Sequence, residues 1–492
     1  MTTTTVQTRD GRVDGTRRDG VDLFLGIPYA TAARFAPPAP PAPWDEPLEA
    51  TAFGPIAPQP GGAHFQRMDH AQSEDCLSLN VWAPATGTVD RPVLVWIHGG
   101  AFRQGSGASP LYEGTELAAR GDVVVVTINY RLGALGFLGH SSVGPADGPH
   151  ANWGLLDQVE ALRWVRDNAT AFGGDPGNVT IFGESAGAVS VALLCTIEAA
   201  RGLFHKAVVQ SGAAITSAFA EAEAFAEELA ELMGVADVAA LADVPLDALL
   251  AAQTQLEARN AVRTFGPTID GDVLAQRPLR ALGGGSAAGV PMMVGTNVDE
   301  WKLWAPMDPH SRDLDEERLR GRLAKRFPAD HIDGILDVFR AERTARGEPV
   351  DPNDLFFAVE TERFFRVHTL HTVEAHADQA PTFVYLFGWG SPAMHGWLGA
   401  CHGLEIAFVF GNQGRGELAA FTGSGPDADA LAGLMMDAWI AFARTGDPST
   451  PTQPWPRHEV ATRPTMVFDR SSRVELAPRD PERAVVEAAL AR

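Results

Sequence analysis

The sequence predicts an α/β fold with a mostly parallel, doubly wound central sheet. Two short apolar runs rich in β-branched residues, VLVWI at 93–97 and VVVVTI at 123–128, are typical of parallel strands that are buried on both faces. Between residues 152 and 173 the apolar positions change to helical spacing, with Leu155, Val159 and Leu162 on one face. Alternation of such strands and helices indicates a sheet that helices cover on both sides.

The alternation continues in order along the chain. Asn152 is a candidate N-cap for the first of these helices, and Gly173 with Gly174 is a candidate end. We then expect strand 179–183, helix 186–196, strand 206–210, helix 219–233, and strands 291–295 and 382–386.

The stretch 301–376 departs from this rhythm because its sequence is charged and mostly helical in pattern. We interpret it as a helical excursion over the carboxyl edge of the sheet, where ligands bind in such folds. We expect one domain over residues 1–492, with this excursion near the entrance of the active site.

Composition and charge disfavour several classes of function. The chain has 492 residues, of which 45% are hydrophobic and 21% are charged, and its formal net charge is -23. Such a charge repels nucleic-acid phosphates and anionic lipid surfaces, so we expect neither nucleic acid nor membrane as a partner. No stretch offers the roughly 18 uninterrupted apolar residues of a membrane span, and the N-terminus has no apolar signal-peptide core. We therefore expect a cytoplasmic protein.

The cysteines agree with a reducing compartment. Cys76, Cys195 and Cys401 are an odd number and lie too far apart along the chain for a zinc cluster, so we expect free thiols and no metal. Cys401 stands beside His402, which leaves a Cys–His nucleophile pair open. Adjacent residues usually point apart, and we favour a packing role for Cys401.

The clearest chemical signal is the pentapeptide GESAG at 183–187. It follows the apolar strand VTIF and opens an apolar helix, which is the strand–turn–helix arrangement of a nucleophile elbow. Glycines on both sides of Ser185 allow a sharp turn that exposes the hydroxyl at the edge of the sheet. An ordinary glycine turn with an incidental serine is the alternative, but this context favours Ser185 as a nucleophile.

A glycine-rich loop, HGGAF at 98–102, directly follows the strand 93–97. Attack on an acyl carbonyl builds negative charge on its oxygen, and backbone N–H groups of such a loop can bind that charge. The residue after the nucleophile, Ala186, supplies a further N–H. His98 is a second candidate for a catalytic histidine, but its place before the loop favours a role in shaping it.

Together these motifs resemble a known family. FGGDPGNVTIFGESAG (172–187) is similar to the serine signature of the type-B carboxylesterase family, and SEDCLSLNVW (73–82) is similar to its second signature. The resemblance continues in the family's order through WIHGGAF (96–102), NYRLGALGFL (129–138), NWGLLDQ (152–158), GTNVDE (295–300), CHGLEIAFVFG (401–411) and FARTGDP (442–448). It covers nearly the whole chain and implies an α/β-hydrolase fold.

The resemblance implies a serine ester hydrolase that uses no cofactor and acts on a small-molecule ester with water. The family pattern places the acid of a catalytic triad on Glu300 and its histidine on His402, in the chain order Ser…Glu…His. His402 takes the proton of Ser185 and returns it to the leaving alcohol, while Glu300 orients the imidazole. With an unperturbed histidine, activity should fall on the acid side with a midpoint of about pH 6–7.

The same resemblance places the N–H groups of the oxyanion hole on Gly100, Ala101 and Ala186. Four phenylalanines are candidates for the substrate pocket, with core packing as the open alternative for each: Phe102, Phe265, Phe364 and Phe365.

Two departures from the family pattern are notable. Many relatives pair the cysteine of SEDCL with an upstream cysteine, but the upstream position here is Ala57, which leaves Cys76 without an evident partner. Trp301 follows Glu300 where the family often has glycine, and its larger side chain should narrow the site behind the triad.

We expect neutral carboxylic esters to be hydrolysed through an acyl-enzyme. A specialised relative that cleaves carbamates, amides or one natural-product ester uses the same machinery, and the residues do not separate these alternatives. A non-catalytic adhesion or scaffold protein of the same fold is a third alternative. Such relatives lack the serine or its partners, and this chain keeps all of them.

Overall fold

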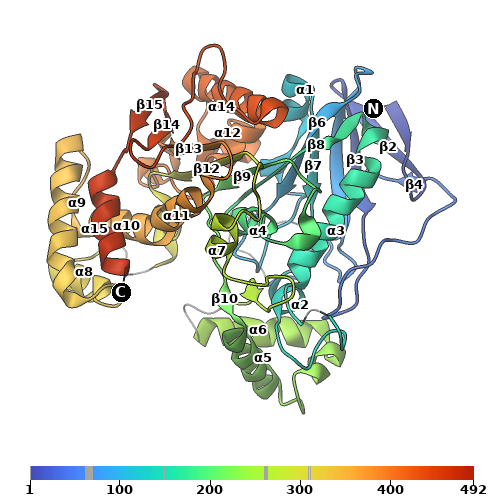
Figure 1. Ribbon diagram of the computed structural model, residues 1–492, viewed down its shortest axis with the longest axis horizontal. Coiled ribbons are helices and arrows are strands. Elements are labelled where there is room, and N and C mark those ends of the chain that lie inside the picture. Colours follow the sequence, from blue (N-terminus) through green and yellow to red (C-terminus); the bar gives the residue numbers. More distant parts are fainter. Residues whose placement is uncertain are drawn as a thin grey trace.

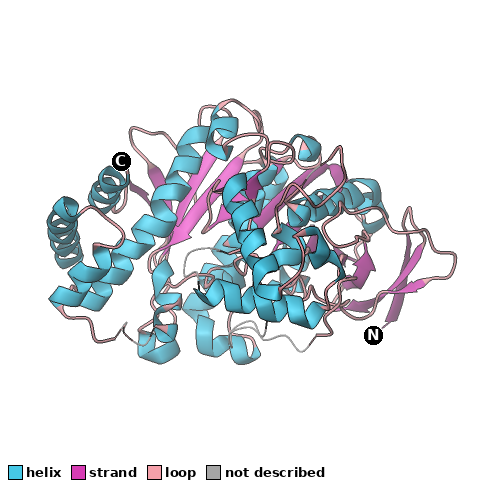
Figure 2. Cartoon of the chain, turned by 90° about the horizontal axis from the view of Figure 1, so that it is seen from below, coloured by secondary structure: helices cyan, strands magenta, loops and turns pink. Residues whose placement is uncertain are grey.

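A mixed β-sheet runs through the centre of the molecule (Figures 1 and 2). The computed structural model describes residues 2–60, 70–148, 150–259, 264–308, 310 and 312–491. Within this part of the chain the strands pair in the order β1-β2-β3-β5-β7-β6-β8-β9-β12-β13-β14-β15, and β4 pairs with β2. The strands are β1 Thr2–Gln7, β2 Arg12–Arg18, β3 Val21–Pro28, β4 Leu48–Glu49, β5 Ser78–Pro84, β6 Arg91–Ile97, β7 Val124–Ile128, β8 Gly174–Glu184, β9 Lys206–Gln210, β12 Met292–Asn297, β13 Thr382–Phe387, β14 Pro464–Phe468 and β15 Arg473–Leu476; β10 Ser217–Ala218 and β11 Thr268–Ile269 form a separate pair.

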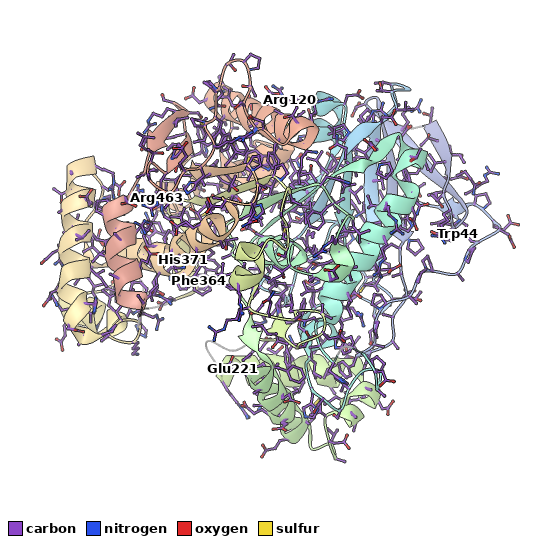
Figure 3. The ribbon with its side chains drawn as sticks, in the orientation of Figure 1. Trp44, Arg120, Glu221, Phe364, His371 and Arg463 are labelled. Carbon is purple, nitrogen blue, oxygen red and sulfur yellow. The ribbon has the colours of Figure 1, made fainter. Side chains whose placement is uncertain are left out.

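Helices lie on both sides of this sheet (Figure 2). They are α1 Thr115–Gly121, α2 Gly133–Phe137, α3 Trp153–Asn168, α4 Ala186–Leu194, α5 Phe219–Met233, α6 Leu246–Arg259, α7 Pro278–Gly283, α8 Glu316–Leu323, α9 Ile332–Arg346, α10 Pro352–Thr361, α11 Val367–His376, α12 Ile406–Phe410, α13 Ala419–Thr422, α14 Pro426–Thr445 and α15 Asp480–Leu490. Neighbouring helices are also joined by charge, as where Arg120 of α1 pairs with Asp437 of α14 at 2.7 Å (Figure 3).

The apolar runs of the sequence form the parallel centre of the sheet. β6 pairs in parallel with β7 and β8, and β9, β12 and β13 continue the parallel order. Alternate side chains of β6 enter different cores: Val93 and Val95 join the core that includes α3 and α4, whereas Leu94 and Trp96 join the core that includes α1, α12 and α14. Because both faces are covered, the strand has no polar face, and the predicted α/β-hydrolase fold with its buried parallel strands is confirmed.

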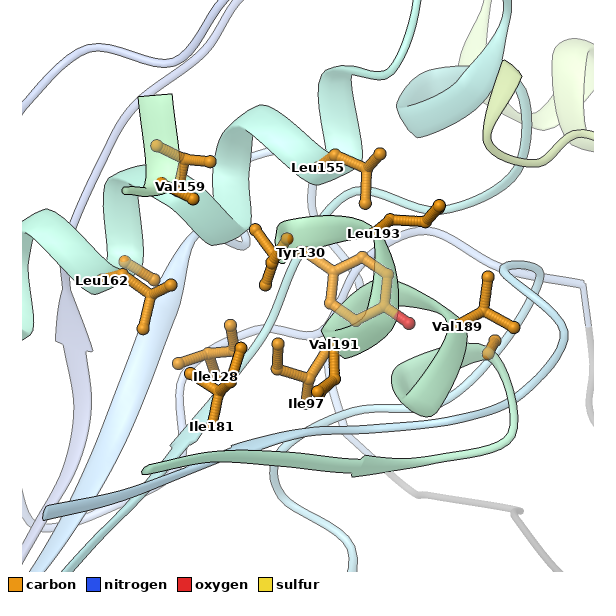
Figure 4. Packing of buried hydrophobic residues seen from close by; sticks show 14 of the residues in the cluster. Ile97, Ile128, Tyr130, Leu155, Val159, Leu162, Ile181, Val189, Val191 and Leu193 are labelled. Carbon is orange, nitrogen blue, oxygen red and sulfur yellow. The ribbon is translucent and has the colours of Figure 1, made fainter. Parts of the chain in front are cut away.

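In the core near the turn at Ser185, α3 and α4 pack on the strands (Figure 4). Leu155 and Val159 of α3 and Val191 of α4 pack in the same buried cluster as Ile97 and Ile181 of the sheet. The predicted helix end at Gly173 is seen as a left-handed residue with φ of 75° after a 3-10 turn.

The predicted N-cap residue of α3 does not cap the helix with its side chain. Asn152 occupies the N-cap position, but its side chain makes no capping hydrogen bond. Instead, Asn152 Nδ2 donates to the carbonyl of Thr268 and its Oδ1 accepts from the Thr268 N–H. Asn152 therefore joins α3 to β11, a contact between distant segments that a local pattern does not show.

The stretch 301–376 contains α8, α9, α10 and α11. Leu370 and Val373 of α11 belong to the main core, whereas Figure 1 shows α8, α9 and α10 at one end of the molecule beside α15. These helices share a separate apolar core with α15, in which Leu336 and Phe339 of α9 and Val486 of α15 are buried. A π-helical turn, Glu362–Arg366, joins α10 to α11. None of the described helices combines the length and apolar character needed to cross a membrane.

All three cysteines lie in the described part of the chain, where they are buried and free. Burial raises the pKa of each thiol, to about 12 for Cys195, so the thiols stay protonated at neutral pH. A protonated, fully buried Cys401 is a poor nucleophile, and its surroundings support a packing role.

Thiol-reducing agents are therefore expected to leave the melting temperature unchanged, because no covalent loop closure would be lost. Thermal unfolding with and without reductant measures this, and thiol titration of the unfolded chain should count three free thiols. A clear drop of the melting temperature in reductant, together with a disulfide found by peptide mapping, would contradict the expectation.

Candidate active site

The predicted site residues leave the sheet at the carboxyl ends of neighbouring parallel strands. Ser185 follows β8, the loop 98–105 follows β6, and Glu300 comes three residues after β12. His402 lies between β13 and α12. Ligands bind outside the carboxyl ends of strands in sheets of this kind. The topology thus gathers residues from four distant parts of the chain at one edge.

Ser185 stands in a strained turn between β8 and α4. Its φ is 56° and its ψ is −123°, a conformation that costs a side-chain-bearing residue about 1–3 kcal/mol. The turn is held by the Ser185 N–H, which donates to the Gln210 carbonyl at 2.9 Å. It also needs glycine at position 187, where an added Cβ would lie 1.9 Å from the Ile97 carbonyl oxygen. The G-x-S-x-G pattern is thus explained by close approach of β6.

The loop after β6 lies against this turn. A Cβ added at Gly99 would be 3.1 Å from Ser185 Cβ, so glycine brings the two segments into contact. Ala101 and Phe102 have φ of 56° and 58°, in the left-handed region. Among the described residues, the N–H groups of Gly100 and Ala101 have no hydrogen-bond acceptor. Ala186 is the first residue of α4, so its N–H has no acceptor within the helix. These N–H groups are available to a ligand.

His98 shapes this loop. Its Nδ1 lies 2.8 Å from the Gly99 carbonyl, and its ring stacks on Tyr130 with centroids 4.4 Å apart. Burial lowers the pKa of His98 to about 4, so the ring is neutral. A neutral, stacked ring at the base of the loop agrees with the structural role predicted for it.

Glu300 and His402 are joined by a direct side-chain hydrogen bond. His402 Nδ1 lies 2.6 Å from Glu300 Oε2, and both side chains are buried. The other carboxylate oxygen of Glu300 accepts the Asn297 N–H at 2.8 Å. The carboxylate is therefore held from two sides, and it fixes the imidazole with Nδ1 toward itself and Nε2 away.

The Nε2 side of His402 faces a second carboxylate. Glu184 Oε1 lies 2.9 Å from Nε2, and both side chains are buried. Burial alone would lower the pKa of His402, but the charges of Glu184 and Glu300 outweigh it and raise this pKa well above its usual value. The midpoint of about pH 6–7 applies to an unperturbed histidine, and the two buried carboxylates beside the ring are expected to move it upward.

Glu405 is a third buried acid near this pair. Its Oε2 accepts from Asn297 Nδ2 at 2.7 Å, and its Oε1 accepts from Gln210 Nε2 at 3.2 Å. Burial and the charges of Glu184 and Glu300 raise the pKa of Glu405 to about 8. Glu405 is therefore mostly protonated at neutral pH and adds little negative charge around His402.

Four aromatic rings form a continuous group beside His402, which we call the aromatic wall: Trp301, Trp304, Phe364 and Phe365. Phe365 and Trp304 contact the imidazole, with ring centroids 4.7 and 4.9 Å from it. Trp301 contacts both Trp304 and Phe364, at 5.3 and 5.4 Å. Phe364 is 46% exposed although it is apolar, and Figure 3 places it on the inner side of the helical stretch, away from α8 and α9.

The candidate pocket residues thus separate into two groups. Phe364 and Phe365 lie on the π-helical turn and reach the histidine, and π-helical turns often occur at functional sites. Phe102 packs on Phe137 and Phe265 packs on Phe225, each with centroids 4.8 Å apart, and both belong to the main core. Among the described residues neither makes a ring contact with His402.

Sequence reasoning missed Trp304 and Glu405. The pattern WKLW at 301–304 was a usable signal for Trp304, because residues three apart in a helical turn lie on one face. Glu405 had no such signal. Among the described residues, no group of three or more His, Cys, Asp or Glu side chains is arranged to hold a metal ion.

The fold is that of the α/β hydrolases. Residues 2–485 match the family model described as "Carboxylesterase family", and the chain belongs to this family. It is 39% identical to the para-nitrobenzyl esterase of Bacillus subtilis (strain 168) over 98% of each chain, and 34% identical to the phenmedipham hydrolase of Pseudarthrobacter oxydans over 91% of this chain and 92% of that one. A carboxylesterase structure from Geobacillus stearothermophilus superimposes with a TM-score of 0.87 at 40% identity, covering 98% of this chain and 99% of that chain. The resemblance predicted from the motifs is confirmed, and the protein is a serine carboxylic ester hydrolase.

The carboxylates of Glu184 and Glu300 should shift the pH dependence of kcat/KM. A base must be neutral to act, and a raised pKa keeps His402 protonated to higher pH, so kcat/KM should rise through a midpoint above about pH 7. Glu184→Gln removes one of the two charges and should lower this midpoint by about one pH unit or more. The pH profile of kcat/KM for a neutral ester measures both values.

Glu160→Gln is the matched control, because Glu160 is also buried but lies on α3 and pairs with Arg163. Its midpoint should equal that of the wild type. An unchanged midpoint in Glu184→Gln would show that Glu184 does not act on the charge of His402.

Proposed function

We propose that Ser185, His402 and Glu300 are the catalytic triad of this hydrolase. The observation that carries the proposal is the orientation of His402: Glu300 holds Nδ1, and Nε2 points to the elbow, where Glu184 Oε1 lies 2.9 Å away. An imidazole that a carboxylate holds at Nδ1, with its Nε2 at the nucleophile elbow, is what proton transfer from a serine requires. Ser185 attacks the ester carbonyl while Nε2 takes its proton, and the imidazolium then gives this proton to the leaving alcohol.

The oxyanion of the tetrahedral intermediate binds, in this proposal, to the N–H groups of Gly100, Ala101 and Ala186. Support comes from the contact of the 98–105 loop with the elbow and from the absence of described acceptors for Gly100 and Ala101. Donors of this kind are worth about 3–4 kcal/mol each in the transition state. Water then hydrolyses the acyl-enzyme, with His402 acting as base a second time.

We propose that the substrates are neutral carboxylic esters and that the aromatic wall binds their alcohol part. His402 delivers its proton to the leaving oxygen, so side chains that contact the imidazole are near the leaving group. The wall offers ring faces and edges, which favour an aromatic alcohol over a saturated one of the same size. Relatives carry names of different substrates, among them fumonisin B1 esterase, and carbamates, amides or a natural-product ester stay open as alternatives.

We further propose that the chain works as one domain in a reducing compartment such as the cytoplasm. Two observations support this: the stretch 301–376 supplies all four residues of the aromatic wall, and the cysteines are buried and free. In this reading the helical stretch is a wall of the active site and has no separate activity.

Ser185→Ala should lower ester turnover by about 10⁴-fold or more while the fold survives, because loss of a triad member removes the chemistry. Steady-state rates with an activated ester, checked by circular dichroism, measure this. Ser190→Ala is the matched control, since Ser190 lies on α4 and bonds to Gln158 in the core. If Ser185→Ala kept more than a few per cent of wild-type activity, the assignment would be wrong.

Trp304→Leu should reduce the preference for an aromatic alcohol. We expect the ratio of kcat/KM for benzyl acetate to that for cyclohexylmethyl acetate to fall about 3- to 10-fold, since ring–ring contacts add about 0.5–1.5 kcal/mol beyond apolar area. The control places the ring on the acyl side of the ester. The ratio of kcat/KM for methyl phenylacetate to that for methyl cyclohexylacetate should not change. Equal changes in both ratios would argue against an alcohol-side wall.

A further inference from the structure

Gln59 makes an unusual set of hydrogen bonds next to the active site. Its side chain is only 8% exposed although it comes from an irregular segment after β4. Gln59 Oε1 accepts the Gly105 N–H at 2.9 Å, and Nε2 donates to the Gly105 carbonyl at 3.0 Å. Nε2 also donates to the Ala57 carbonyl at 2.9 Å. One side chain thus binds both backbone groups of a single residue.

Gly105 is the far end of the loop that carries Gly100 and Ala101. The loop closes on itself: the N–H groups of Arg103 and Gln104 donate to the Gly100 carbonyl, and a Cβ added at Gly105 would lie 2.5 Å from the Gly99 oxygen. The two ends of the loop are therefore in contact. A side chain that holds Gly105 also limits the movement of Gly99 and the N–H groups that follow it.

The loop needs such support because its backbone is strained. Ala101 and Phe102 both have φ in the left-handed region, which persists only where the surroundings hold it. The Gly133 N–H holds the middle of the loop through the Phe102 carbonyl at 2.6 Å. Gln59 holds its far end, and Gln59 is itself fixed by its own N–H, which donates to Gln72 Oε1 at 2.9 Å.

We propose that Gln59 is a positioning residue for the oxyanion hole: by clamping Gly105 it keeps the N–H groups of Gly100 and Ala101 in the place where negative charge develops. The proposal rests on the proposed function of these two N–H groups. Donors that are held in place before the reaction stabilise the transition state without reorganisation, and donors that move do not. The effect should therefore fall on the chemical step.

Gln59→Met tests this with a side chain of similar length that neither donates nor accepts in the same way. We expect kcat to fall by about ten- to a hundredfold, short of the loss of a whole donor, with KM for the ester changed less than about threefold. The inhibition constant of a trifluoromethyl ketone, which forms an oxyanion adduct with the serine, should rise by the same factor as kcat falls.

Gln453→Met is the matched control. Gln453 is also 8% exposed, and its Nε2 contacts Met466 at the other end of the chain. It also replaces a buried amide by a thioether, but it should keep kcat and ketone binding within about twofold. Gln59→Glu is the second variant if Gln59→Met does not fold, because it keeps the acceptor for the Gly105 N–H and replaces only the donor. It should show the same parallel loss of kcat and ketone affinity.

The outcomes separate this proposal from the function on which it rests. If a fluorophosphonate does not label Ser185 of the wild type, the triad assignment fails, whatever Gln59 does. If Ser185 is labelled and Gln59→Met or Gln59→Glu keeps kcat, or loses ketone affinity no more than Gln453→Met, the positioning role is overturned. A parallel loss of kcat and ketone affinity with little change in KM supports it.

Discussion

The register of β6 against β8 is the constraint on which the active site depends. Ile97, the last residue of β6, pairs with Gly183, the last residue before the elbow dipeptide Glu184–Ser185. The loop after β6 and the elbow after β8 therefore leave the sheet at the same level and in contact. Because side chains alternate along a strand, a slip of one residue would turn the buried runs of β6 toward the wrong core. Packing on both faces of the sheet thus fixes the geometry at its edge.

Electrostatics at this edge follow from burial. His402 has little access to water, so the fields of Glu184 and Glu300 act on it through a medium of low dielectric. The aromatic wall covers one side of the ring and keeps water from screening these charges. Asn297 and Gln210 hold the nearby acids by hydrogen bonds, which limits the number of buried groups without partners. As a result, Glu300 fixes the orientation of the His402 ring, and Glu184 and Glu300 together raise its pKa.

Support for the site comes from segments outside the parallel centre. The segment after β4 contributes Gln59, which binds Gly105, and the helical stretch contributes Phe365 and Trp304, which contact the histidine. The strained residues of the 98–105 loop and of the turn at Ser185 are thus surrounded by several elements that come from distant parts of the chain. A strained active site is stable only in such over-determined surroundings.

Much of the fold could be predicted from the sequence because its signals are local. Strand 206–210 and helix 219–233 were predicted with the bounds that the structure has, since one is a continuous apolar run and the other an alanine-rich amphipathic segment. The elbow was also evident, because two close backbone approaches require glycine on either side of Ser185. By contrast, β1 and β2 were not predicted. Their sequences TTTTVQ and RVDGTRR lie at an exposed edge and carry few apolar residues to alternate.

What the sequence determined by itself was the parallel centre of the sheet, the turn at Ser185 and the glycine loop, together with a family resemblance that selected His402 among 14 histidines. Only the tertiary structure decided that Glu184 faces His402, that Trp304 covers it, that Phe102 and Phe265 pack in the core, and that Gln59 holds Gly105. The physical reason is that a pKa, a ring contact or a backbone clamp arises from groups brought together by long-range packing. Such groups are separated by tens to hundreds of residues along the chain, and no local pattern records their distance in space.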